Sequence, residues 1–183
     1  MSDKKILPPA LAPFVMQWGE LGSAWGIGRS AARIHGLLLI SDRSLTADEI
    51  VAGLDIARSN VSMSMKDLRA IGLVETQPSI GDRKERFSAV DDPIEIATRI
   101  AAWRKAREFD PALAALKATG DANAPKDVAN RLQKLSKFAE TVDVWQNQMA
   151  ALSPGQIKAG LKAGAAVADL VPAKKKKKKE KTG

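Results

Sequence analysis

Apolar residues recur at helical spacing through most of the chain. Near the start they form a stripe with steps of four, three and four, which predicts a helix that Pro13 begins and Gly26 ends. Ser30 is expected to cap a second helix that stops near Ser41. The residues of the first stripe are Phe14, Trp18, Leu21 and Trp25.

Two more helices and a hairpin follow. Thr46, with Glu49 three residues later, predicts a capping box at the start of a short helix. Residues 57–71 carry apolar side chains at steps of four and three and are followed by a glycine, which suits a helix end. Residues 73–77 and 85–90 predict two strands that must pack on the helices, because an isolated hairpin is only marginally stable.

The second half of the chain is predicted to be helical. Pro93 opens a long helix with Ile96, Ile100 and Trp103 on its inner face, and the pair at 110–111 is expected to kink it or to cap a new helix. A heptad rhythm from Pro125 onward is typical of a helix–helix seam, and a last alanine-rich helix ends near Val171. The seam positions are Val128, Leu132, Leu135, Ala139, Val142, Gln146 and Met149.

The expected fold class is mainly α with a small β-hairpin wing. The predicted elements are a helix, a short capped helix, a second helix and a hairpin. This is the order of a winged helix-turn-helix domain, in which one helix enters the DNA major groove. The predicted organisation is an N-terminal helix at a dimer interface (1–25), the DNA-binding domain (26–91), a helical dimerisation and effector region (92–171) and a disordered lysine-rich tail (172–183).

The helix over 57–71 has an unusual polar face. Three serines and one asparagine lie within residues 59–64, although these side chains disfavour helix interiors by competing for backbone hydrogen bonds. Asparagine can pair with adenine, and Met63 can lie against a thymine methyl group. The alternative is a solvated face of poor helix propensity. The residues expected to contact DNA are Arg58, Ser59, Asn60, Ser62, Met63 and Lys66.

Two other groups of cations are candidates for DNA contact. At the hairpin tip, Arg83, Lys84 and Arg86 suit the negative potential of a narrow minor groove, although a loop charged for solubility is the alternative. The formal net charge is +8, of which residues 174–183 hold +6 and leave +2 for the rest. The tail lysines are expected to attract DNA phosphates without sequence preference. They are Lys174, Lys175, Lys176, Lys177, Lys178 and Lys179.

Several kinds of site are not expected. The stretch WGIGRSAARIHG (25–36) has the glycines of a phosphate loop, but a helical stripe rather than a strand precedes it, so a turn between helices is favoured over a nucleotide-using enzyme. With no cysteine and one histidine, His35, no disulfide, metal or cofactor is expected. His35 is expected on a helix surface or packed. Without a signal peptide or an apolar run long enough to span a bilayer, we expect a cytoplasmic protein without membrane contact.

The sequence resembles the GbsR branch of the MarR-like transcriptional regulators. The matching segments are GRSAARIHGLLLI (28–40), TADEIVAGL (46–54), ARSNVSMSMKDLRAIGLVE (57–75) and GDRKERF (81–87). The resemblance implies a homodimeric winged-helix repressor or activator. Two departures are Ala57, where a capping serine is usual, and Gly28, where relatives often carry proline.

The resemblance also raises the question of a small-molecule effector. Some relatives are described as sensing choline-like cations, which aromatic cages suit. Trp25 and Trp103 are therefore candidates for an effector pocket, although tryptophan at helical spacing usually belongs to the core.

The preferred hypothesis is a homodimeric repressor that binds double-stranded DNA at a palindromic operator. A nonspecific, nucleoid-type DNA-binding protein driven by the lysine tail is the main alternative. A nucleotide-using enzyme and a protein-interaction module without DNA affinity are the others.

Overall fold

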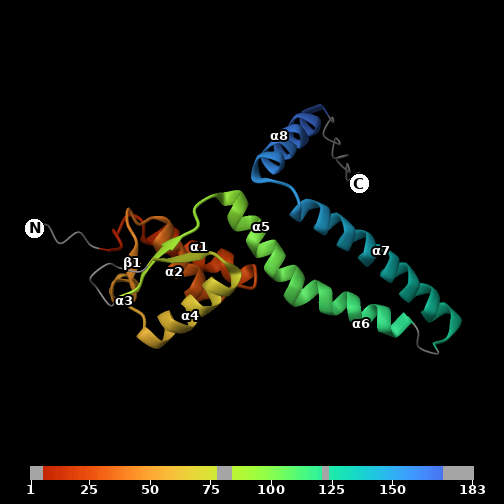
Figure 1. Ribbon diagram of the computed structural model, residues 1–183, viewed down its shortest axis with the longest axis horizontal. Helices are drawn as coiled ribbons and strands as arrows, with labels where there is room; N and C mark the ends of the chain where they lie inside the picture. The colour runs from red at the N-terminus through yellow and green to blue at the C-terminus, as the bar shows by residue number, and fades with distance from the viewer. Residues whose placement is uncertain (1–5, 78–83, 121–123, 171–183) are drawn as a thin grey trace, which may run out of the picture. The chain divides into compact units, whose positions relative to one another are not determined.

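The computed structural model describes residues 6–77, 84–120 and 124–170, and the chain divides between Ala114 and Ala115 into two compact units. The predicted fold class, mainly α with a small β-hairpin, is confirmed. The first unit holds α1 (Ala12–Ala24), α2 (Arg29–Leu39), β1 (Leu45–Thr46), α3 (Ala47–Leu54), α4 (Arg58–Ile71), β2 (Val74–Gln77), β3 (Arg86–Ala89), α5 (Pro93–Arg104) and the π-helical turn η1 (Lys105–Phe109) (Figure 1). Helix α6 (Asp110–Gly120) crosses the division, and α7 (Lys126–Ala150) and α8 (Pro154–Leu170) lie in the second unit.

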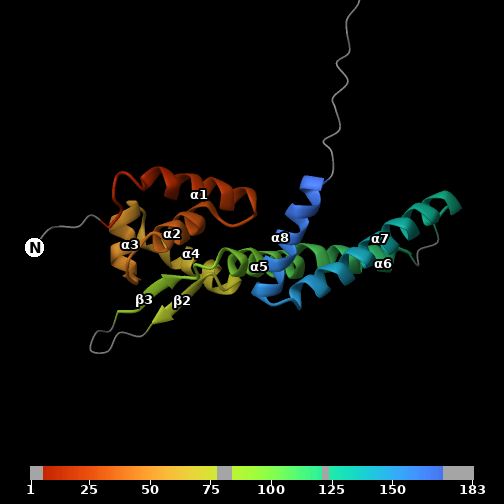
Figure 2. The same cartoon turned by 90° about the horizontal axis from the view of Figure 1, so that it is seen from above.

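The described residues form one antiparallel sheet of three strands in the order β1-β3-β2. The hairpin pairs Val74 with Ala89, and its two strands lie side by side along the helices of the first unit (Figure 2). Strand β1 was not predicted, because two residues are too short to show any periodicity. Its Thr46 pairs with Arg86 and also begins α3, where it forms the predicted capping box with Glu49.

Helix α4 ends as its sequence predicts. Gly72 adopts a left-handed conformation with φ of 82°, which glycine reaches without steric cost, and Leu73 N–H then donates to the Leu68 carbonyl over 2.9 Å. The Arg99 side chain of α5 donates to the Gly72 carbonyl, so a cation lies at the carbonyl end of α4. At the other end, Ala57 provides no side-chain cap, as expected.

One core unites helices α2 to α5 with the sheet of the first unit. Ile34 and Leu37 of α2 and Leu68 of α4 are fully buried, and Ile96 and Ile100 of α5 belong to the same cluster, as their spacing predicted. Helix α5 therefore packs with the winged-helix elements in this core.

The inner face of α1 differs from the predicted stripe. Val15, Gly19 and Gly22 are buried, whereas Phe14, Leu21 and Trp25 are substantially exposed. The reason is close approach to α2, because a Cβ placed on Gly22 would lie 2.3 Å from the Ala32 Cβ. The glycines, rather than the large apolar side chains, thus determine how α1 packs.

The start of α2 also differs from the prediction. Gly28, not Ser30, occupies the N-cap position, and no side chain caps this helix. The Ser30 hydroxyl instead accepts a hydrogen bond from Asn60 of α4 over 3.2 Å. Ser30 therefore connects two helices rather than ending one.

A π-helical turn stands where the sequence predicted a kink or a new cap. Residues Lys105–Phe109 form this turn, and α6 continues directly from Asp110. A local change in hydrogen-bond pattern accommodates Pro111, which has no N–H to donate. In the second unit, Ser153 and Gln156 bond reciprocally at the predicted start of α8.

Candidate nucleic-acid interface

Helix α4 separates an apolar inner face from a polar outer one. Val61, Met65 and Leu68 are buried in the core. Met63 lies on the outer face with 71% of its surface exposed, although methionine usually avoids water. The other exposed side chains of the predicted DNA-contacting set are Arg58, Ser59, Ser62 and Lys66.

Asn60 does not lie on this outer face as the helical spacing suggested. It is half-buried, and its Nδ2 donates to the Ser30 hydroxyl while its Oδ1 accepts from Ser64 over 3.4 Å. The carboxamide thus ties α4 to α2. These bonds occupy one of its two N–H donors and its oxygen within the protein.

The cations beside this face are held by two carboxylates at the start of α3. Asp48 pairs with Arg58 of α4 and with Lys84, which lies two residues before β3. The Lys84 Nζ is 3.2 Å from the Asp48 Oδ2. Glu49 accepts from Arg43 over 2.6 Å and lies 3.8 Å from Arg86 of β3. Sequence reasoning missed both carboxylates as interface residues, since Glu49 was explained by its capping role alone.

These pairs lower the pKa of both carboxyl groups. The hydrogen bond from Arg43 lowers the pKa of Glu49 to about 2, with burial opposing it and the Thr46 backbone assisting. The hydrogen bond from Lys84, followed by the charge of Arg58, lowers the pKa of Asp48. Both carboxylates are therefore ionised at neutral pH.

Arg69 fixes the end of α4 to the hairpin. Its Nε donates to the Thr76 hydroxyl over 3.1 Å, its Nη2 donates to Glu85 over 2.8 Å, and its guanidinium lies 5.3 Å from the centre of the Phe87 ring. The C-terminal end of α4 is thus bonded directly to the hairpin, whereas at its N-terminal end Arg58 reaches Lys84 only through Asp48 of α3. Arg83 and Lys174 to Lys179, predicted to contact DNA, lie outside the described residues.

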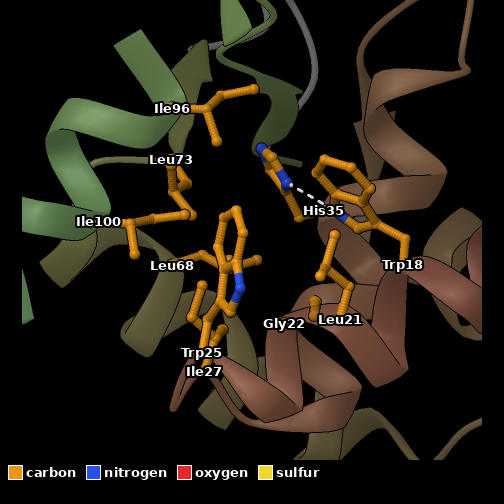
Figure 3. A pocket seen from close by; sticks show the side chains of 11 residues that line it. Trp18, Leu21, Gly22, Trp25, Ile27, His35, Leu68, Leu73, Ile96 and Ile100 are labelled. Atoms are coloured by element: carbon orange, nitrogen blue, oxygen red, sulfur yellow. Dashed lines mark hydrogen bonds between the residues drawn. The ribbon is translucent and has the colours of Figure 1, made fainter. Parts of the chain in front are cut away.

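The two tryptophans proposed for an effector pocket line different hollows. Trp25 lines an apolar pocket of about 20 Å³ with Trp18, His35 and Ile100, which holds little more than one water molecule (Figure 3). Trp103 lines another of about 120 Å³, where the Arg107 guanidinium lies 4.6 Å from its ring centre. The structure therefore does not bring Trp25 and Trp103 together in either hollow, and the effector pocket stays a prediction.

His35 is packed rather than exposed. Only 2% of its surface is accessible, and its Nδ1 accepts from the Trp18 indole N–H over 3.2 Å. Desolvation lowers the His35 pKa to about 4, against a smaller opposing effect of the Val90 backbone. The imidazole is neutral at physiological pH, with Nδ1 as the acceptor.

The described residues offer neither a metal site nor a helix that could span a membrane. No cluster of three or more histidine or acidic side chains is arranged to hold a metal ion there. None of the helices in residues 6–77, 84–120 and 124–170 has the length and apolarity to cross a membrane. The glycine turn follows helix α1 rather than a strand, which removes the structural context that a phosphate loop needs.

Family and structure comparisons agree with this geometry. Residues 25–85 match the model of the MarR family. This span covers α2 to β2 and ends just before β3, so it includes α4 and the carboxylates of α3. The MarR match supports a DNA-binding transcriptional regulator with a winged helix-turn-helix domain.

The fold of the chain also resembles that of a solved protein. A solved structure described as a transcriptional regulator has a TM-score of 0.61 and 23% identity, and the match covers 78% of this chain and 96% of that one. A transcriptional regulator from Thermotoga maritima matches with a TM-score of 0.38 and 18% identity over 73% of this chain and 89% of that one, which is too distant to add to the argument. No curated protein matches the sequence.

Proposed function

We propose that the chain is a sequence-specific transcriptional regulator of the GbsR branch, a homodimeric repressor that reads a palindromic operator with α4 and its wing. The outer face of α4 carries this proposal. It exposes Met63 and short hydrogen-bonding side chains on a helix whose other face is buried in the core. Lysines 174–179 add attraction to phosphates that does not depend on sequence.

The selection of bound sequences from a random DNA pool tests the proposal directly. A two-fold symmetric motif is expected, because a symmetric dimer presents two copies of α4 to two half-sites. Binding without any preferred motif would favour the nonspecific, nucleoid-type alternative. Absence of DNA binding would leave the interaction module as the better description.

Replacing Met63 and Lys66 should separate base contact from phosphate contact. Met63→Ala is expected to reduce discrimination at one base pair by about 1 kcal/mol, since it removes an apolar contact to a thymine methyl. Lys66→Ala is expected to weaken binding to all sequences alike and to reduce the slope of log K against log salt by about 0.9. Titrations with the selected motif and its single-base variants measure both effects.

Matched controls exist elsewhere on the chain. Met16 is an exposed methionine on α1, and Lys134 is an exposed lysine on α7. Met16→Ala and Lys134→Ala should leave affinity and selectivity unchanged. If Met63→Ala and Lys66→Ala behave like these controls, α4 is not the reading helix.

The homodimer is proposed to form through the exposed apolar side chains of α7. Leu135 and Phe138 are 56% and 68% exposed, and Val144 and Trp145 are similarly exposed. The predicted seam positions Leu132 and Ala139 are half-buried, so the exposed surface only partly coincides with the seam. Apolar surface of this extent on one helix favours burial against a partner.

Leu135→Asp is expected to raise the dimer dissociation constant at least tenfold, which corresponds to about 1.4 kcal/mol, because a carboxylate would lose its hydration in the interface. Gln133→Asp adds the same charge at an exposed polar position of α7 and should leave the dimer intact. Sedimentation velocity at micromolar concentration measures the difference. A parent protein that sediments as a monomer would contradict the proposal.

A further inference from the structure

Asp48 lies between the two elements proposed to contact DNA. Its carboxylate pairs with Arg58, the first residue of α4, and with Lys84 near the base of the wing. The neighbouring Glu49 holds Arg43 and Arg86 in the same way. Two carboxylates at the start of one helix therefore pair with four cations beside the candidate interface and offset part of their charge.

The Asp48 pairs are open to exchange. More than half of each of the three side chains is accessible to solvent. Ion pairs this exposed contribute little stability, because water and salt screen them. A phosphate oxygen can replace the carboxylate without exposing any buried group.

The contacts of the Asp48 side chain distinguish it from a residue that only caps its helix. Thr46 and Glu49 already provide the capping box of α3, so the Asp48 side chain is not required to satisfy the first N–H groups. It connects instead two segments far apart in the sequence, the start of α4 and the approach to β3.

We propose that Asp48 is a specificity-determining residue, which holds Arg58 and Lys84 in fixed positions and masks their charge until correctly placed phosphates displace it. This inference rests on the proposed function. In an imperfect complex the phosphates do not meet both cations, so the carboxylate keeps them. In a complex with the preferred motif, both cations exchange the carboxylate for a phosphate. Their charges then add to the affinity for that motif.

Without the carboxylate, two long flexible side chains would reach phosphates in any register. Affinity for unrelated DNA then rises more than affinity for the preferred motif. Each cation newly used on unrelated DNA adds about 0.9 to the magnitude of the salt slope.

Asp48→Asn in the full chain tests the proposal. The two probes are a duplex with the motif selected from the random pool and a scrambled duplex of equal length, each titrated at several salt concentrations. Affinity for the scrambled duplex should rise about three- to tenfold at low salt, its salt slope should steepen by about one to two, and the ratio of the two affinities should fall.

Asp55→Asn is the matched control. Asp55 ends α3 with φ of 53°, a conformation that asparagine tolerates, and among the described residues it forms no ion pair. Asp55→Asn removes the same charge from the same helix, so any change in its affinity for DNA reports the general electrostatic effect alone. Thermal unfolding of both variants should match the parent, because Asp48 and Asp55 are exposed.

The outcomes separate this inference from the function beneath it. If the parent binds its motif and the two variants behave alike, the role of Asp48 is overturned and the regulator stands. If Asp48→Asn weakens binding to both duplexes, Asp48 merely positions DNA-binding cations, and the inference is also overturned. If neither the parent nor Asp48→Asn binds any DNA, the proposed function itself fails and takes this inference with it.

Discussion

The free energy of unfolding is expected to fall by about 3 kcal/mol as the pH is lowered from 6.5 to 4, because folding keeps His35 neutral. Burial lowers the pKa of His35 from 6.5 to about 4 in the folded protein. Between these values the unfolded chain binds a proton at this residue and the folded chain does not. The stability that folding gains from the neutral form of His35 is therefore fully present above pH 6.5 and is lost as the pH falls toward 4.

The measurement is urea unfolding of the parent and of His35→Gln at intervals from pH 7 to pH 4. Glutamine can still accept from Trp18 but does not titrate, so the difference between the two proteins isolates the imidazole. Glu49 begins to lose its own stabilising effect as the pH falls through its ordinary pKa of 4.5, because folding lowers that pKa to about 2, but this effect is the same in both proteins and cancels in their difference. Parallel pH profiles for the two proteins would show that His35 is not buried as the neutral form.

Replacement of Gly22 is expected to have a comparable effect on stability. A Cβ there would lie 2.3 Å from the Ala32 Cβ, a distance that real atoms do not adopt, so α1 must move away from α2. Gly22→Val should lower the free energy of unfolding by about 3 kcal/mol, near the upper end of the usual cost of overpacking. Chemical denaturation monitored by circular dichroism gives this value.

A second substitution at the same contact makes the test specific. Ala32→Gly removes the methyl group that Gly22→Val would meet, so the double variant should recover part of the loss. Gly28→Val is an independent control, since a Cβ at Gly28 meets nothing within 4 Å. Additive effects of Gly22→Val and Ala32→Gly would contradict the close contact between α1 and α2.

Local sequence signals predicted the elements well but not all of their contacts. The capping box at Thr46 and the glycine end of α4 are determined by nearest neighbours, and both were confirmed. The buried face of α1 was not predicted, because hydrophobicity favours the large side chains while backbone approach favours glycine. Strand β1 depends on partners 40 and 42 residues later, because Thr46 pairs with Arg86 and Leu45 pairs with Phe87.

In the candidate interface, too, the sequence predicted local features but not contacts between distant segments. Exposure of Met63 and Lys66 followed from helical periodicity. The inward turn of Asn60 depends on where α2 places Ser30, and the pairing of Asp48 with Lys84 depends on where the wing returns. Such contacts between distant segments leave no periodic trace in the sequence.

The strand order also limits aggregation through the sheet. Strand β3 is paired on both sides, and the edge strand β1 offers only Leu45–Thr46 before α3 begins. The other edge, β2, is four residues long and carries the charged Glu75. Short or charged edges are poor templates for strands of another molecule, so a concentrated solution of the protein should resist amyloid-like stacking of its sheets.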